Sequence, residues 1–363
     1  AADFVGRDFV KLIHGGDVEG FREEFGREPL DFSANISPLG LPEGVRQGVI
    51  DSLNQATQYP DPLCRKLRRA IGEKEGIDPE YIQCGNGAAD LIFRLVLAKR
   101  PQRALVTAPT FAEYEQALTA FGCEVDRYLL TKEEGFALTP RFLEALEEKP
   151  DMVFLCNPNN PTGNLIAPSL LRQIWEKCRE KGILLVVDEC FLSFLPRPWE
   201  HTLKKEVQEG APLLLLRAFT KLYAMAGIRL GYCLCGDRQL LSQMAGAGQP
   251  WGVSVLAQEA GLAALQEDQY VENVRALIGK ERPWLWQQLE RAGVHVVGGS
   301  VNYLFFRSDV PQLGEKMRRL GVMIRSCANY PGLSEGWYRV AVRTREENQR
   351  LVDCIRQAGE GDR

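Results

Sequence analysis

The chain has 363 residues, of which 45% are hydrophobic and 25% charged, and its formal net charge is −4. These values are typical of a soluble globular protein with a core large enough for two structural domains. They argue against a basic surface that binds nucleic acid, and no apolar run approaches the roughly 18 residues that span a bilayer. The N-terminus carries no signal-peptide pattern, so we expect a cytoplasmic protein that binds neither membrane nor nucleic acid.

Ten cysteines are scattered along the chain without a C-x-x-C pair, and only three histidines are present. We interpret the cysteines as the reduced thiols of a cytosolic protein. Cys233 and Cys235 would share one face of a strand, which leaves room for a joint metal site. No other cluster of ligands supports such a site, so we predict no metal.

The first 45 residues are interpreted as irregular, and regular alternation of helices and strands begins at about residue 62. Expected helices span 64–76, 90–99, 112–122, 140–148 and 168–182, and expected strands span 103–109, 124–130, 152–158, 183–189, 212–219 and 229–235. Strands such as 183–189 are apolar throughout and should be buried on both faces. This pattern predicts an α/β fold with a mostly parallel sheet.

The pattern changes after about residue 254. A long helical region, roughly 255–292, precedes three strand-like or mixed segments and a closing helix from Glu346, which is typical of a smaller α+β unit. We therefore expect a large domain (46–254) and a small C-terminal α+β domain (255–363). An N-terminal segment (1–45) is expected to join the small domain and the substrate site.

Polar residues follow several apolar runs, at the sheet edge where α/β proteins bind ligands. The glycine-rich stretch QCGNGAAD (83–90) enters a helix and could hold a phosphate on its backbone N–H groups, or be only a turn. In FLCNPNNPTG (154–163) an asparagine could bond a ligand or simply stop the strand. Asp188 ends LLVVD and needs a cation or donor as partner, which a helix cap or a core salt bridge could also supply.

Lys221 ends the run LLLLRAFTK, and Arg229 follows eight residues later. A lysine in a dry pocket has a lowered pKa and can attack a carbonyl to form a Schiff base, although a single buried lysine more often lies at a core edge. Arg229 offers a fork for a phosphate. Together with the phosphate turn, the asparagine and Asp188, these residues indicate a pocket for pyridoxal 5'-phosphate, in which Asp188 keeps the ring nitrogen protonated.

The motifs NPNNPTG, VVDE and TKLYAMAGIRLGY stand in the order and spacing of the fold-type-I pyridoxal-phosphate enzymes, which the chain resembles. It is similar to their histidinol-phosphate aminotransferase-like branch. HGGD (14–17), LDFSANISPLGLP (30–42), YPDP (59–62) and MIRSCANYPGL (323–333) resemble the threonine-phosphate decarboxylases of cobalamin biosynthesis. The resemblance, from about His14 to Arg343, implies a large domain with a mostly parallel seven-stranded sheet, a smaller α+β domain, and a homodimer with shared active sites.

The resemblance also implies roles toward the cofactor. Lys221 would carry it, Asp188 would pair with its pyridine nitrogen and Asn160 would bond its ring hydroxyl. Its phosphate would be held by Gly87, Ala88, Thr220 and Arg229. Tyr114 would stack on the ring, and Tyr59 would reach the cofactor phosphate of the neighbouring subunit. Without the resemblance, both tyrosines would pass as core aromatics.

A phosphorylated amino acid is the substrate that the resemblance implies. Its phosphate and carboxylate would be bound by His14, Gly15, Asn35, Asn160, Arg325 and Arg339. Two positions depart from many aminotransferases of this fold: Phe191 stands where a tyrosine often bonds the ring hydroxyl, and Ala218 stands where a serine or threonine often bonds the phosphate. The decarboxylase branch also accepts phenylalanine at the first position.

The reaction follows from which bond at Cα stands perpendicular to the cofactor ring. Our leading hypothesis is decarboxylation of L-threonine O-3-phosphate to (R)-1-aminopropan-2-yl phosphate. L-Serine O-phosphate differs by one methyl group and remains an alternative. A second alternative is an aminotransferase for histidinol phosphate or a similar phosphorylated amine. A third, a non-catalytic regulator, should have lost Lys221, which is present.

Overall fold

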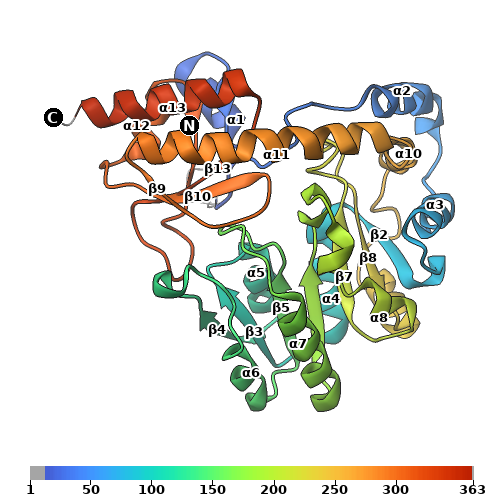
Figure 1. Ribbon diagram of the computed structural model, residues 1–363. Helices are drawn as coiled ribbons and strands as arrows, with labels where there is room; N and C mark the ends of the chain where they lie inside the picture. Colours follow the sequence, from blue (N-terminus) through green and yellow to red (C-terminus); the bar gives the residue numbers. More distant parts are fainter. Residues whose placement is uncertain (1–12, 362–363) are drawn as a thin grey trace, which may run out of the picture.

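The computed structural model describes residues 13–361, which form a seven-stranded sheet, a four-stranded sheet and a two-stranded pair (Figure 1). Helices flank both larger sheets. The 3₁₀ helices of this region are η1 (Leu53–Thr57), η2 (Pro79–Tyr81), η3 (Lys132–Glu134), η4 (Leu146–Glu148), η5 (Leu192–Phe194) and η6 (Pro198–His201). The expected helix at 140–148 is split into a short α-helix, α6 (Phe142–Ala145), followed by η4.

The seven-stranded sheet confirms the predicted mostly parallel α/β architecture. Its strands are β2 (Ile82–Gly85), β3 (Arg103–Ala108), β4 (Glu124–Leu129), β5 (Met152–Cys156), β6 (Leu184–Asp188), β7 (Leu214–Ala218) and β8 (Gly231–Cys235). They are ordered β2-β8-β7-β6-β5-β3-β4, and only β8 runs antiparallel to its neighbours. The edge strand β2 was not among the expected strands, because its four residues, IQCG, carry no apolar run.

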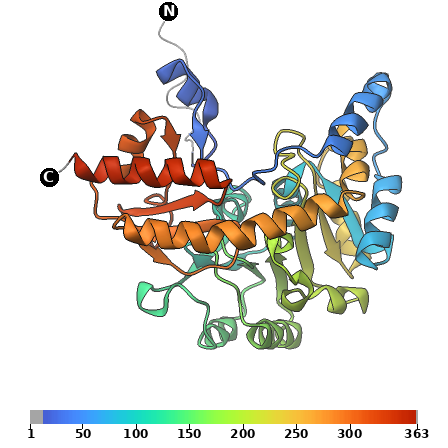
Figure 2. The same cartoon turned by 45° about the horizontal axis from the view of Figure 1, so that its top comes forward.

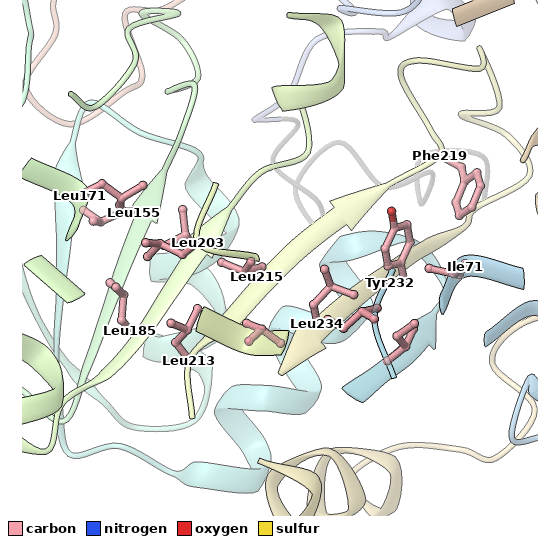
Figure 3. Close-up of a cluster of buried hydrophobic side chains, with 14 of the residues drawn as sticks. Ile71, Leu155, Leu171, Leu185, Leu203, Leu213, Leu215, Phe219, Tyr232 and Leu234 are labelled. Carbon is pink, nitrogen blue, oxygen red and sulfur yellow. The ribbon is translucent and has the colours of Figure 1, made fainter. Parts of the chain in front are cut away.

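Alternate side chains of the central strands fill two separate cores, one on each face of the sheet. On one face, Leu155, Leu185 and Leu215 pack beside Leu234 (Figure 3). The helices that contribute to this core are α2 (Glu43–Ser52), α3 (Arg65–Glu75), α6, α7 (Pro168–Lys181), α8 (Lys204–Gln208) and α10 (Val255–Ala264). The opposite face is covered by α4 (Gly87–Lys99), α5 (Ala112–Ala120) and α9 (Arg238–Gly246). Burial on both faces explains why these strands are apolar throughout.

The four-stranded antiparallel sheet belongs to the C-terminal part of the chain. Its strands are β9 (His295–Val297), β10 (Tyr303–Arg307), β12 (Arg325–Ser326) and β13 (Trp337–Ala341), in the order β12-β13-β10-β9. The helices of this part are α11 (Asp268–Arg291), α12 (Leu313–Arg319) and α13 (Arg345–Glu360). In both views α11 extends from this sheet toward the large domain (Figure 2). This arrangement is the smaller α+β unit that the sequence predicts.

The N-terminal segment is more regular than the sequence indicated, because Val18–Phe25 forms helix α1. The Asp17 carboxylate caps it by accepting the N–H of Gly20, and only Phe21 of the helix is buried. The helix has only eight residues, fewer than the window over which a helical period is recognised, which is why the expectation of an irregular segment was wrong there. Strand β1 (Leu30–Asp31) then pairs with β11 (Val322–Met323) and fixes the segment to the small unit.

Helix α2 (Glu43–Ser52) packs against α10, on the side of the seven-stranded sheet (Figure 2). Ala257, Ala260 and Ala264 of α10 belong to the core of that sheet. Because α10 contributes to the core of the seven-stranded sheet, the large unit extends past residue 254. The next helix, α11, begins at Asp268. The boundaries at 46–254 and 255–363 remain a prediction.

Candidate active site

A cavity of about 220 Å³ lies where the strand ends of the large sheet meet the N-terminal segment and the small sheet. Every residue predicted for the site lines this cavity except three, which are Gly87, Tyr114 and Tyr59. The lining residues that the sequence did not single out for the site are Ser33, Ala34, Ala89, Phe111, Glu113, Cys156, Cys190 and Tyr330. Phe191 and Ala218, the two departures, also line it.

Three adjacent parallel strands deliver three of the predicted side chains. Asp188 is the last residue of β6, Asn160 follows β5 and Lys221 follows β7. The carboxyl ends of parallel strands meet at one edge of the sheet, so these residues converge although they are far apart in sequence. Thr220 stands beside Lys221 in the same lining.

The amine of Lys221 loses its proton more readily than that of an ordinary lysine. Burial, and after it the positive charge of Arg339, lowers the pKa of Lys221 to about 8. The backbone is also held in place, because the Lys221 carbonyl accepts the N–H of Ser37 at 2.9 Å. A lysine in this state is a nucleophile for a carbonyl carbon near neutral pH.

Asp188 is buried, and burial raises the pKa of its carboxyl group. The Tyr114 hydroxyl and the backbone N–H of Cys190 both donate to it. A buried carboxylate in this position favours a further cationic partner, such as a protonated ring nitrogen.

Tyr114 does not lie where the sequence suggested. Its ring is fully buried and stacks on Phe154, with ring centroids 5.0 Å apart, while its hydroxyl supports Asp188. Phe111, one helical turn earlier, lines the cavity and meets Tyr114 edge-on. The geometry therefore favours Phe111 for contact with a flat ligand. The sequence correctly indicated an aromatic residue near the start of α5, but the residue that lines the cavity is Phe111, three positions before Tyr114.

The turn into α4 has the shape of an anion site. Gly87 has φ +78°, and a Cβ there would lie 2.5 Å from Nη2 of Arg229. A Cβ at Gly231 would lie 2.6 Å from the backbone nitrogen of Ala88. Both positions therefore require glycine, and the helix N-terminus and the guanidinium of Arg229 come close together. This is a cradle for a phosphate.

Arg339 is 5% exposed and lies on the central strand β13. Its guanidinium donates to Oδ1 of Asn160 and, at 2.7 Å, to the carbonyl of Ser33. Within residues 13–361 its Nε has no hydrogen-bond partner, nor does the buried Oδ1 of Asn35. Buried polar atoms left open at a cavity wall are typical of a binding site.

Arg325 lies directly opposite Arg339 on the paired strands β12 and β13. Like charges opposite each other destabilise a sheet unless an anion lies between them. The guanidinium of Arg325 lies over the ring of Tyr330, 5.1 Å from its centroid, and donates to the carbonyl of Ile13 and to Asn329. The two arginines therefore indicate an anion-binding wall.

His14 and Gly15 close the cavity from the N-terminal segment. Nε2 of His14 lies 3.0 Å from Oε1 of Glu113, and a Cβ on Gly15 would lie 2.4 Å from the carbonyl oxygen of Ser33. Gly15 is thus required by close packing. Nothing in the sequence marked Glu113, because it stands among other acidic residues of an ordinary helix start.

Tyr59 does not line the cavity. It is 80% exposed and stacks on Trp251, whose ring centroid is 4.7 Å away. Other exposed large apolar residues occur in the same N-terminal region: Leu39, Ile50, Leu53 and Leu63. Large apolar side chains exposed to solvent are common at interaction surfaces.

The described part of the chain offers no group of His, Cys, Asp and Glu residues that could hold a metal ion. Its cysteines are all free thiols. None of its helices combines the length and apolar character needed to cross a membrane.

Comparison with known proteins agrees with this geometry. Residues 27–355 match the aminotransferase class I and II family, and the chain belongs to it. The chain is 37% identical to threonine-phosphate decarboxylase of Salmonella typhimurium, over 94% of this chain and 95% of the relative. It is 32% identical to histidinol-phosphate aminotransferase of Symbiobacterium thermophilum, over 98% of both. The crystal structure of histidinol-phosphate aminotransferase from Clostridium acetobutylicum superposes with a TM-score of 0.85 at 26% identity, covering 92% of this chain and 99% of that one.

The protein is therefore a pyridoxal-phosphate-dependent enzyme of this family. The residues present fit the cofactor: a lysine of lowered pKa, a buried carboxylate and a glycine cradle beside Arg229 occur around one cavity. Family membership leaves open which bond of which substrate is broken.

Proposed function

We propose that the enzyme decarboxylates L-threonine O-3-phosphate to (R)-1-aminopropan-2-yl phosphate and CO₂, a reaction of adenosylcobamide assembly. The pairing of Arg325 with Arg339 across β12 and β13, beside Lys221, carries the proposal. Two adjacent guanidinium groups, with His14 on the same cavity, suit a substrate that bears both a phosphate and a carboxylate. The 37% identity to a threonine-phosphate decarboxylase supports the same substrate.

We assign the cofactor contacts as follows. Lys221 carries the cofactor, Asp188 holds its ring nitrogen and Asn160 its ring hydroxyl. The phosphate lies on Gly87 and Ala88, with Thr220 and Arg229 as further donors. Phe111, rather than Tyr114, covers the ring, and Tyr114 fixes the orientation of Asp188 through its hydroxyl.

The cations of the cavity select the bond that breaks. When bound, pyridoxal phosphate accepts the electron pair of whichever Cα bond stands perpendicular to its ring. With the substrate phosphate anchored by His14 and one arginine, the carboxylate is free to stand perpendicular and leave as CO₂. The Lys221 amine, or water, returns a proton to Cα. Orientation of this kind lowers a barrier by several kcal/mol, roughly a thousandfold in rate.

Transamination of histidinol phosphate is the second candidate. Relatives with that name match this chain over nearly its whole length, at 32% identity in one case. The cofactor contacts would be the same, and only the substrate shell would differ. A preference for L-serine O-phosphate is a third candidate, because one methyl group contributes only about 1–3 kcal/mol of discrimination.

We also propose a homodimer in which Tyr59 reaches the cofactor phosphate of the partner subunit. Its 80% exposure and the exposed apolar residues near it support this role. Trp251, stacked on Tyr59, would hold it in position.

The decisive experiment uses the cofactor-loaded enzyme, carboxyl-labelled L-threonine O-phosphate and no keto acid, and counts released CO₂. We expect release that disappears in Lys221→Ala. If nothing is released, and amine transfer appears once histidinol phosphate and 2-oxoglutarate are added, the enzyme is a transaminase. L-Serine O-phosphate as a parallel substrate tests the methyl preference.

A further inference from the structure

Glu113 presents a second carboxylate, besides Asp188, to a cavity that is also lined by three arginines. It stands in the first turn of α5, with its side chain 18% exposed, and lines the same wall as His14 and Phe111. Its Oε2 is buried and, within the described residues, lacks a hydrogen-bond partner. A carboxylate at this position repels an anionic ligand unless another contact of the carboxylate offsets this repulsion.

Glu113 makes such a contact with His14. Oε1 of Glu113 lies 3.0 Å from Nε2 of the His14 ring, which also packs on Phe111 with centroids 5.6 Å apart. His14 comes from a loop before α1 and has a 41% exposed side chain. Glu113, on a helix of the large unit, therefore fixes the position of a side chain on a loop of the N-terminal segment.

The contact also decides which ring nitrogen is left for a ligand. A carboxylate at Nε2 holds a proton on that nitrogen, so Nδ1 remains for the substrate. Glu113 therefore sets which edge of the His14 ring a phosphate can meet.

We infer that Glu113 is a positioning residue for the substrate phosphate and acts through His14. This inference rests on the proposed function, because it requires a phosphorylated substrate at this wall. It deepens that function by naming the group that orients the histidine and by predicting the sign of its effect. If Glu113 acted on the ligand directly, removing its charge would tighten phosphate binding. If it acts through His14, removal weakens binding.

The chain supplies a matched control on the same helix. Glu115, two residues later, pairs with Arg127 on the surface, and both side chains are partly exposed. Glu115→Gln removes the same charge from α5 without touching His14. Glu113→Asp keeps the charge of Glu113 on a shorter stem.

The test is calorimetric titration of cofactor-loaded enzyme with inorganic phosphate, together with KM and kcat for L-threonine O-phosphate. We expect Glu113→Gln to weaken phosphate binding about tenfold, the loss expected of one charge-assisted hydrogen bond, and to raise KM more than it lowers kcat. Glu113→Asp should recover part of the loss, and Glu115→Gln should match the wild type. Binding of L-threonine, which has no phosphate, should stay unchanged.

A double-mutant cycle with His14→Asn tests whether Glu113 acts through His14. In that background Glu113→Gln should have no further effect on phosphate binding, because its partner is gone. Equal losses in both backgrounds, tighter phosphate binding in Glu113→Gln, or a matching loss for L-threonine would each overturn the inference. The titration needs no turnover. An enzyme that releases no CO₂ but follows this binding pattern would therefore contradict the proposed reaction and not the role of Glu113.

Discussion

The site has two halves that differ in how they are assembled. The cofactor half consists of Asn160, Asp188 and Lys221, at the ends of adjacent parallel strands. The substrate half consists of His14, Arg325 and Arg339, on a loop and on two short strands of the small sheet. The first half is built by a single sheet, whereas the second exists only when segments about 300 residues apart come together.

The hydrogen bonds of Arg325 and Arg339 show how the substrate half depends on contacts that are distant in sequence. Arg339 donates to Ser33, which is 306 positions earlier, and Arg325 donates to Ile13, which is 312 positions earlier. The two guanidinium groups thus hold the N-terminal segment against the small sheet. In the proposed function, the cofactor half supplies the pyridoxal-phosphate chemistry and the substrate half selects the reaction. Variants of the two halves should therefore fail in different ways.

The largest effect is expected in the cofactor half. Lys221→Ala should lower the rate of any reaction of the enzyme by about a thousandfold or more, because it removes the residue that we propose to carry the cofactor. Absorbance of the purified protein measures bound cofactor, and CO₂ release or amine transfer measures activity. Lys205→Ala, at an exposed lysine of α8, is the control and should behave as the wild type. Substantial turnover in Lys221→Ala would contradict the assignment.

The cofactor half could be predicted from the sequence for a physical reason. Asp188 ends the strand LLVVD, and Lys221 follows a strand that begins with three leucines. A charged residue beside such an apolar run needs a pocket or a partner. Six strands of the large sheet were expected from local pattern, and the number seven came from the resemblance. Strand β2 and helix α1 were not expected, because Ile82–Gly85 has only four residues and α1 only eight.

The substrate half was reached by resemblance and not from local pattern. No periodicity marks Arg325 as the neighbour of Arg339, since their pairing depends on the register of β12 and β13. Glu113 and Phe111 were missed because their function depends on which side of α5 faces the cavity. Tyr114, on the same helix, was assigned a ring contact that its buried position does not allow.

The second largest effect is expected in the substrate half. Arg339→Lys should raise KM for L-threonine O-phosphate by about a hundredfold, because lysine cannot reproduce the guanidinium contacts to Asn160 and Ser33. Arg325→Lys should have a smaller effect, about tenfold, because its side chain is less buried and binds at the rim. Steady-state kinetics measures both, and unchanged cofactor absorbance confirms that the cofactor half is intact. Loss of cofactor in either variant would break the division into two halves.

A third prediction concerns the wall over the cofactor ring. Phe111→Ala should weaken cofactor binding about tenfold, because stacking contacts of an aromatic side chain contribute roughly 1–2 kcal/mol. Tyr114→Phe keeps the stack on Phe154 and loses only the bond to Asp188, so it should lower kcat and leave cofactor affinity nearly unchanged. Cofactor titration of the two apoproteins measures the difference. If Tyr114→Phe weakened cofactor binding more than Phe111→Ala did, Tyr114 and not Phe111 would contact the cofactor ring.

The smallest effect tests whether the two halves communicate through charge. Burial, and then Arg339, lowers the pKa of Lys221 to about 8. Only the neutral amine attacks the cofactor aldehyde, so uptake of cofactor by the apoprotein should become faster as pH rises through about 8. Arg339→Met removes a positive charge and raises the pKa of Lys221, which moves the midpoint to higher pH by up to about one unit. Arg339→Lys keeps the charge and should keep the midpoint.

The stability of the apoprotein should follow the same titration. The pKa of Lys221 is lower in the folded chain than the ordinary value of about 10.4, so between these values the unfolded chain binds more protons. The free energy of unfolding therefore rises with pH across this window, and Lys221→Met should lose that part of the slope. Denaturant titrations at several pH values measure it. The contrary result is that Arg339→Met leaves both the pH midpoint of cofactor uptake and this slope unchanged. In that case the charge of Arg339 does not affect the pKa of Lys221, and burial alone accounts for the lowered value.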